Sequence, residues 1–282
     1  MSALSILRQL RHGSLKKFDK VWFFLGKIYR FFITRWKPGF ACSHYIGKYG
    51  PFQLDAYFSF SDFKNWGAGH NRGFEMCVQA CENKKCVIDI GAHIGLVSLP
   101  VSRLIHREGS IYAIEPAKAN RVYLERHVAL NKRNNIQIYD LLIGDTDMEN
   151  QIFFEQKAVS GMNSLVKNKK TIDGSYEKTH KKQMTLDSFC EKYALRPDLI
   201  KIDIEGAEIL ALKGARKTLH HYRPTLFLSV HPAHIAQLGQ DVNELHELIR
   251  DYGYVVQDVN GRQVEHFKLD EYILMPKERV HA

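Results

Sequence analysis

The stretch VIDIGAHIGLVSL, residues 87–99, decides the fold of this chain. It opens with an apolar run that predicts a buried strand ending at Asp89. The run GAHIG follows as a tight turn, and the apolar residues behind it predict a helix. Gly91 lets the backbone pass close to a ligand, and Gly95 lets the helix and the strand approach each other. Many α/β domains that bind nucleotides begin with a strand, a glycine turn and a helix in this order.

The rest of the chain predicts the same alternation of strands and helices. Such alternation implies a mainly parallel sheet, here of seven strands, with helices on both faces. Residues 150–185 interrupt the pattern, and we interpret them as a hairpin with a mobile loop. The expected strands span residues 86–90, 110–116, 135–144, 199–206, 224–232, 254–259 and 271–276.

The net charge of +9 is concentrated at the N-terminus. Residues 1–40 contain nine Lys and Arg side chains and one Asp, or +8, so the other 242 residues, with 31 basic and 30 acidic side chains, carry +1. Because the main part of the chain is nearly neutral, we do not expect a nucleic-acid partner. The five cysteines form no CxxC pair and are odd in number, which favours reduced thiols in a cytoplasmic protein over a zinc site at Cys77, Cys81 and Cys86.

Residues 14–37 predict an amphipathic helix within a basic arm, residues 1–40, ahead of a lead-in segment and the main domain, residues 41–282. Lysine and arginine gather on one face of the helix and aromatic residues on the other. Lys27 and Arg30 interrupt its apolar stretch, which is too short to span a bilayer. We expect the helix to pack on its own domain or on a second subunit, or to lie peripherally on the inner face of a membrane.

The second predicted strand ends at Glu115, twenty residues after Gly95. An acid in this position can accept both ribose hydroxyls of an adenosine. Such an acid could bind the ribose of NAD equally well, but the NAD-binding fingerprint GxGxxG is missing from the turn GAHIG. We place His93, inside the turn, and Leu142, in the third predicted strand, on the cofactor side as well.

A second group of polar residues follows the fourth and fifth predicted strands. In LIKIDIEGAEILALKGA, residues 199–215, Asp203 ends a buried strand, and Glu205 and Glu208 follow. Lys201 and Asp203 should point to the same side of that strand. His231 ends the fifth strand. Carboxylates and a histidine at the carboxyl edge of a sheet suit proton transfer or metal binding, while Glu208 suits the N-terminus of a helix.

The order of these motifs resembles the FkbM family of methyltransferases over about residues 70–230. The similarity rests on DIGAHIGLVSL, on AIEP with Asn131 downstream, on TLDSF (residues 185–189), and above all on LIKIDIEGAEILALKGA. It implies a class I (Rossmann-like) methyltransferase fold that uses S-adenosylmethionine. Asp89, Gly91 and Gly95 would hold the methionine portion and Glu115 the ribose. The family often has asparagine where this chain has His93.

Known members of that family methylate hydroxyls of sugars or polyketides. We therefore expect an O-methyltransferase acting on a sugar, a glycan or another small metabolite. Asp203, Glu205 and His231 are the candidates for positioning or deprotonating the acceptor hydroxyl. The two carboxylates would suit a divalent metal, although the sequence does not require one. An NAD-dependent oxidoreductase and a non-catalytic, membrane-associated scaffold are the alternatives.

Overall fold

The computed structural model describes residues 19–36, 39–68, 71–165 and 176–280. Its centre is a seven-stranded sheet in the order β11-β12-β10-β9-β3-β4-β5. Both pairings of β12 are antiparallel and the other neighbours are parallel, so the expected, mainly parallel sheet is confirmed. The strands are β3 (Cys86–Ile90), β4 (Ser110–Ile114), β5 (Ile136–Tyr139), β9 (Leu199–Ile202), β10 (Thr225–Val230), β11 (Tyr254–Asp258) and β12 (Asp270–Pro276).

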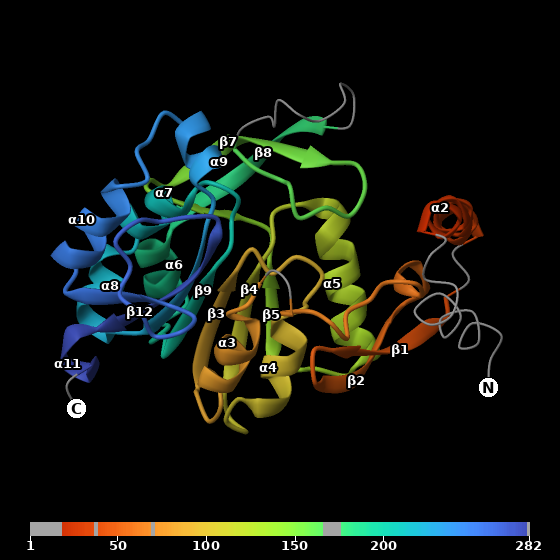
Figure 1. Ribbon diagram of the computed structural model, residues 1–282, viewed down its shortest axis with the longest axis horizontal. Helices are drawn as coiled ribbons and strands as arrows, with labels where there is room; N and C mark the ends of the chain where they lie inside the picture. Colours follow the sequence, from red (N-terminus) through yellow and green to blue (C-terminus); the bar gives the residue numbers. More distant parts are fainter. Residues whose placement is uncertain (1–18, 37–38, 69–70, 166–175, 281–282) are drawn as a thin grey trace.

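Helices cover both faces of this sheet, as the alternation predicted (Figure 1). Successive strand residues point to opposite faces, so Val87 and Leu199 pack into one apolar core, and Ile88 and Ile200 into the other. The first core is closed by α3 (Phe74–Ala80), α4 (Ser98–Leu104) and α5 (Lys118–Leu130). The second is closed by α6 (Leu186–Lys192), α7 (Glu208–Lys213), α8 (Arg216–Tyr222) and α10 (Glu244–Asp251).

The prediction of one strand over residues 135–144 was wrong, because the chain leaves the central sheet after Tyr139. Asp140, which follows, forms ion pairs with Arg121 at 2.6 Å and Lys181 at 3.4 Å instead of continuing the ladder. The chain then enters a second sheet with the order β6-β8-β7. Its strands are β6 (Leu142–Gly144), β7 (Met148–Gln156) and β8 (Tyr176–Thr185). The β7–β8 pair confirms the expected hairpin, whereas residues 166–175 of the expected loop lie outside the described residues.

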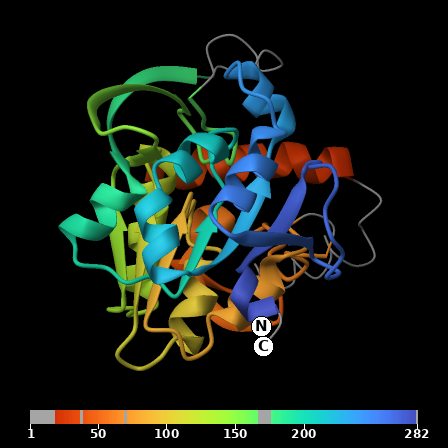
Figure 2. The ribbon, with the colours of Figure 1, turned by 90° about the vertical axis from the view of Figure 1, so that its left-hand side faces the viewer.

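The N-terminal helix is confirmed as α2 (Asp19–Trp36); residues 14–18 and 37 of the prediction lie outside the described part. The lead-in segment forms an antiparallel pair, β1 (Ala41–Ile46) and β2 (Tyr49–Asp55), and the short helix η1 (Ala56–Phe58). Figure 1 shows α2 end-on beside this segment, and Figure 2 shows its length across the far side. Among the described residues, no helix is long and apolar enough to cross a membrane.

Candidate active site

A cavity of about 730 Å³ opens at the carboxyl ends of β3, β4, β9 and β10. It lies where the strand order reverses between β3 and β9, which is the place where open α/β sheets bind ligands. The expected site residues that line it are Asp89, Gly91, His93, Glu115, Leu142, Asp203, Glu205 and His231. Gly95 is not among them, because its Cα faces α5, where an added Cβ would lie 2.9 Å from Leu124 Cδ1. Its place is the contact between the turn and α5.

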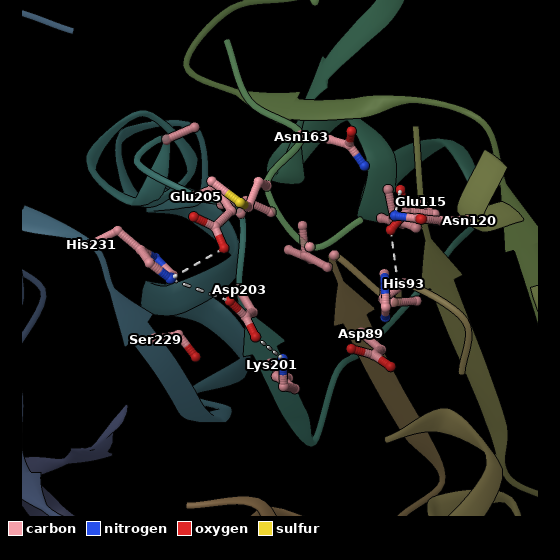
Figure 3. Close-up of a pocket in the computed structure, with 18 of the residues that line it drawn as sticks. Asp89, His93, Glu115, Asn120, Asn163, Lys201, Asp203, Glu205, Ser229 and His231 are labelled. Atoms are coloured by element: carbon pink, nitrogen blue, oxygen red, sulfur yellow. Dashed lines mark hydrogen bonds and ion pairs between the residues drawn. The ribbon is translucent and has the colours of Figure 1, made fainter. Parts of the chain in front are cut away.

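Two groups of polar side chains face each other across the cavity (Figure 3). We call Asp89, Gly91 and Glu115 the turn side, since they come from the glycine turn and the strand beside it. We call Asp203, Glu205 and His231 the acid–histidine side.

On the turn side, Asp89 is almost fully buried and has one carboxylate oxygen still open. Ser98 Oγ donates a hydrogen bond to Asp89 Oδ2 at 2.6 Å, whereas Oδ1 has no partner among the described residues. Burial raises the pKa of Asp89, and the nearby Lys201 ammonium opposes that shift. A buried acceptor without a partner costs free energy, so Asp89 Oδ1 is prepared for a donor that a ligand would bring.

Gly91 joins the two sides. Its φ of +85° favours glycine, and an added Cβ would lie 1.9 Å from the carbonyl oxygen of Asp203. The amide of Asp203 in turn donates to the carbonyl of Ile90 at 3.0 Å. The glycine turn and the end of β9 therefore hold each other in place.

Glu115 is oriented by backbone amides from two directions. His93 N donates to Oε2 at 2.8 Å, and Ala117 N donates to Oε1 at 2.9 Å. Asn120 Nδ2 also donates to Oε1, in a longer hydrogen bond of 3.4 Å. Of about four acceptor positions on the carboxylate, one is therefore open and one is only weakly occupied, and these could take ribose hydroxyls. Burial raises the pKa of Glu115 to about 7. His93 has a φ of +52°, a conformation in which asparagine and histidine are enriched, and this explains why either residue fits the turn.

The acid–histidine side brings together residues that follow the carboxyl ends of two neighbouring strands, β9 and β10. His231 Nε2 lies 3.8 Å from Asp203 Oδ1 and 3.6 Å from Glu205 Oε1. Lys201 Nζ donates to the other Asp203 oxygen at 3.0 Å, so the two residues share one side as expected. Burial would raise the pKa of Asp203, but the charges of Lys201 and His231 hold it below its usual range.

Glu208 is more than the first acid of α7. It is fully buried, and its Oε1 accepts a hydrogen bond from Gly206 N at 3.0 Å and lies 2.7 Å from His231 Nδ1. Burial lowers the pKa of His231, but the hydrogen bond and charge of Glu208, with Glu205 and Asp203, raise it to about 9.

Several residues in the pocket wall or directly beside it had no signal in the sequence. Asn120 and Ser160 exchange two hydrogen bonds, of 2.8 and 3.0 Å, and Ser164 Oγ donates to the carbonyl of Glu205 at 2.8 Å. These contacts attach the segment after β7 to both sides of the cavity. No spacing rule connects residues 160–164 to the two motifs, because the contacts arise only when the second sheet folds over the first.

Numbered in chain order, the central sheet runs 3-2-1-4-5-7-6, with the seventh strand antiparallel to its neighbours. This order, with an acidic cleft at the reversal point, defines a class I methyltransferase. The FkbM methyltransferase domain matches residues 89–256, and the chain belongs to that family. The match decides against the oxidoreductase alternative.

Individual relatives are distant. Methyltransferase 1 of Beauveria bassiana is 24% identical over 143 residues, which cover 45% of this chain and 57% of the relative, so the chain spans little more than half of its length. The structure of an FkbM methyltransferase from Methylobacillus flagellatus is 18% identical, with a TM-score of 0.44 over 69% of this chain and 44% of that one. A fibrillarin from Aeropyrum pernix, solved with bound S-adenosyl-L-methionine, is 16% identical, with a TM-score of 0.38 over 70% and 67%.

Proposed function

We propose that this chain transfers a methyl group from S-adenosylmethionine to a hydroxyl of a sugar, a glycan or another small metabolite. The observation that supports this proposal is that the turn side and the acid–histidine side line the same cavity. One side offers acceptors for an amine and a ribose, and the other offers carboxylates and a histidine for a hydroxyl.

The turn side fits the cofactor through its open acceptors. Asp89 Oδ1 would take the ammonium of the methionine portion, and Glu115 would accept the ribose hydroxyls. Leu142 adds apolar lining to the cavity between these groups and the second sheet. S-adenosylmethionine supplies an electrophilic methyl carbon and a neutral thioether as leaving group.

The acid–histidine side would hold the acceptor hydroxyl in line with that methyl carbon. Asp203 and Glu205 present carboxylate oxygens that can accept the hydroxyl proton, while the acceptor oxygen forms its new bond to carbon and the carbon–sulfur bond breaks. Lys201 keeps Asp203 ionised and fixed in direction.

Calorimetry with S-adenosylmethionine, its demethylated product and NAD tests the first half of this proposal. We expect binding of the first two and none of NAD. A screen with labelled methyl groups over glycans, hydroxylated metabolites, lipids and RNA then tests the acceptor class. Tight NAD binding, or transfer to RNA alone, would contradict the proposal.

A further inference from the structure

We infer that Asp203, Glu205 and His231 form a binding site for one divalent cation, next to the place where the acceptor hydroxyl would lie. The role of this ion in methyl transfer rests on the proposed function, but the site itself rests on geometry. Within the described part of the chain, these three residues are the group whose ligand atoms have the spacing of a metal site, all within 4.8 Å of one another.

The individual distances fit an ion at the centre of the group. His231 Nε2 is 3.6 Å from Glu205 Oε1 and 3.8 Å from Asp203 Oδ1. Ligands bound at about 2.0–2.2 Å are separated by distances of this size when they share an ion. Figure 3 shows the three side chains converging, and they come from the segments that follow β9 and β10.

The surroundings of His231 prepare it as a ligand. Its Nδ1 lies 2.7 Å from the buried Glu208 carboxylate, so the Nδ1 proton is directed there and Nε2 faces Asp203 and Glu205. Metal-binding histidines commonly donate their second ring nitrogen to a carboxylate in this way. His234 Nδ1 lies 3.0 Å from the other oxygen of Glu205, although it forms no hydrogen bond among the described residues.

The excess of acidic side chains around the cavity also favours the binding of a cation. Among the described lining residues, six are Asp or Glu and two are Lys or Arg. Arg72 and Lys201 are paired with Asp270 and Asp203, respectively. Glu205 is left without a permanent cation beside it among these residues. An ion held by one imidazole and two carboxylates would compensate this charge and lower the pKa of a bound hydroxyl.

Mn²⁺ is the probe, because its free concentration is measurable by electron paramagnetic resonance without cofactor or acceptor. We expect one bound ion per chain, with affinity reduced more than about tenfold by Glu205→Gln. Glu208→Gln should reduce it about 10- to 100-fold, because Glu208 offers the ion no ligand atom and supports His231 and the backbone amide of Gly206. Asp270→Asn is the matched control, since it removes the same charge from the rim of the same cavity and should leave Mn²⁺ affinity unchanged. Melting temperatures of all variants show that each is folded.

No bound Mn²⁺ at millimolar ion, or equal loss in the Asp270 control, would overturn the metal site. These results are separate from those on the proposed function. A chain that binds Mn²⁺ through Glu205 but not S-adenosylmethionine keeps the metal site and loses the methyltransferase proposal. A chain that binds S-adenosylmethionine but not Mn²⁺ would keep the methyltransferase proposal and lose the metal site.

A second, independent observation concerns α2, and we propose that its exposed apolar face lies on an anionic membrane surface. Val21, Leu25, Ile28 and Phe32 recur at helical spacing and are all exposed. Phe24, Phe31 and Trp36 extend this face, with exposed fractions of 62%, 64% and 76%. So large an exposed apolar surface on one short helix indicates a surface that something covers.

The contacts of α2 with its own domain lie to one side of that face. Tyr29 Oη donates to the carbonyl of Ala56 at 3.0 Å and lies within hydrogen-bond distance of Ser59 Oγ, at 2.9 Å. Its ring packs edge-on against Phe60. Packing on the domain, which we expected as one alternative, therefore accounts for a flank of the helix and leaves the aromatic face outward. Charge selects the occupant, because residues 1–40 carry +8 of the +9 net charge.

Flotation with vesicles of phosphatidylcholine alone or mixed with phosphatidylserine tests this proposal with the full chain. We expect binding to the anionic vesicles, weakened by salt and reduced about tenfold or more in a Phe24→Ser, Phe31→Ser, Trp36→Ser triple variant. Val122→Ser, which removes an exposed apolar side chain from α5, is the control and should float like wild type. Absence of flotation would overturn the proposal, as would a wild-type dimer that the triple variant loses, since a second copy would then cover the face.

Discussion

The two sides of the cavity are built in different ways. On the turn side, the Glu115 carboxylate is held mainly by backbone amides of His93 and Ala117, which come from the same short stretch of chain. On the acid–histidine side, His231 is held by side chains, with Glu208 behind it and Asp203 and Glu205 in front. The first arrangement is held by backbone donors of the chain itself. The second places three carboxylates around one histidine, and their negative charge must be balanced by a ligand, an ion or a proton.

This difference separates two tasks that the proposed methyl transfer to a hydroxyl requires. Rigid backbone donors suit a cofactor that must be bound in one orientation at every turnover. A cluster of coupled charges suits the step in which a proton leaves the acceptor, because its balance changes when the hydroxyl binds. If the two sides have these separate tasks, a substitution on one side should change either cofactor binding or turnover and leave the other unchanged. A substitution at Gly91, where the two sides are in contact, should change both.

The largest effect is expected where they meet, at Gly91. Gly91→Ala introduces a Cβ that would lie 1.9 Å from the Asp203 carbonyl, in a backbone conformation that disfavours alanine. Strain and overpacking should together cost roughly 2–6 kcal/mol of folding stability and impair binding on both sides. Urea unfolding and cofactor titration measure this. Gly161→Ala is the control, since it lies in the same cavity with no atom within 4 Å of its added Cβ.

Glu205→Gln should break the acid–histidine side alone. We expect turnover to fall about 10²- to 10⁴-fold, as for loss of a group that handles a proton or positions the acceptor. Affinity for S-adenosylmethionine should change little, because Glu205 lies across the cavity from Glu115. Glu205 is a better choice than Asp203, whose removal would also strand the buried Lys201 ammonium. Unchanged turnover at saturating acceptor would assign the chemistry elsewhere.

Glu115→Gln should break the turn side alone. The amide keeps the shape but loses charge-assisted hydrogen bonds worth about 1.5–3 kcal/mol, so cofactor affinity should fall roughly 10- to 100-fold. Mn²⁺ affinity should stay as in wild type, which is the reverse of the Glu205 result. Calorimetry with S-adenosylmethionine and resonance with Mn²⁺, on the same preparation, compare the two. A Glu115 variant that binds the cofactor normally would remove the ribose contact from the proposal.

The same difference explains what the sequence could predict. The turn side lies within about thirty residues, and its spacing from Asp89 through Gly91 to Glu115 follows from one strand–turn–helix–strand unit. That unit also made the parallel sheet predictable. Glu115 was therefore found from local pattern alone, and the structure places it in the cavity.

The acid–histidine side was found only in part. Asp203, Glu205 and His231 were visible as polar residues at strand ends, but the hydrogen bond between Glu208 and His231 joins α7 to the end of β10 and has no local signature. The raised pKa of His231 follows from that contact and was missed with it. The break at Asp140 was also hidden, because residues 135–144 are largely apolar on both sides of it and tertiary ion pairs decide where the strand ends.

The smallest expected effect is a pH dependence confined to the turn side. Burial raises the pKa of Glu115 to about 7, and the form that accepts ribose hydroxyls is the carboxylate. Affinity for S-adenosylmethionine should therefore be weak below pH 6 and strengthen as pH rises through about 7. With one group of this pKa, the ionised fraction, and so the affinity, changes about tenfold between pH 6 and pH 8.

His93, whose pKa burial lowers to about 4, stays neutral over this range and does not contribute. The titration of Asp89, whose pKa is also raised, and of the cofactor amine would also change the affinity with pH. The wild-type affinity is therefore compared with that of Glu115→Gln at each pH. Both of these contributions to the pH dependence persist in the variant, so they cancel in the ratio of wild-type affinity to variant affinity. We expect this ratio to rise about tenfold from pH 6 to pH 8. A ratio that is flat with pH would mean that Glu115 is already ionised in the free protein, held so by the amides of His93 and Ala117, and that the backbone donors outweigh burial on the turn side.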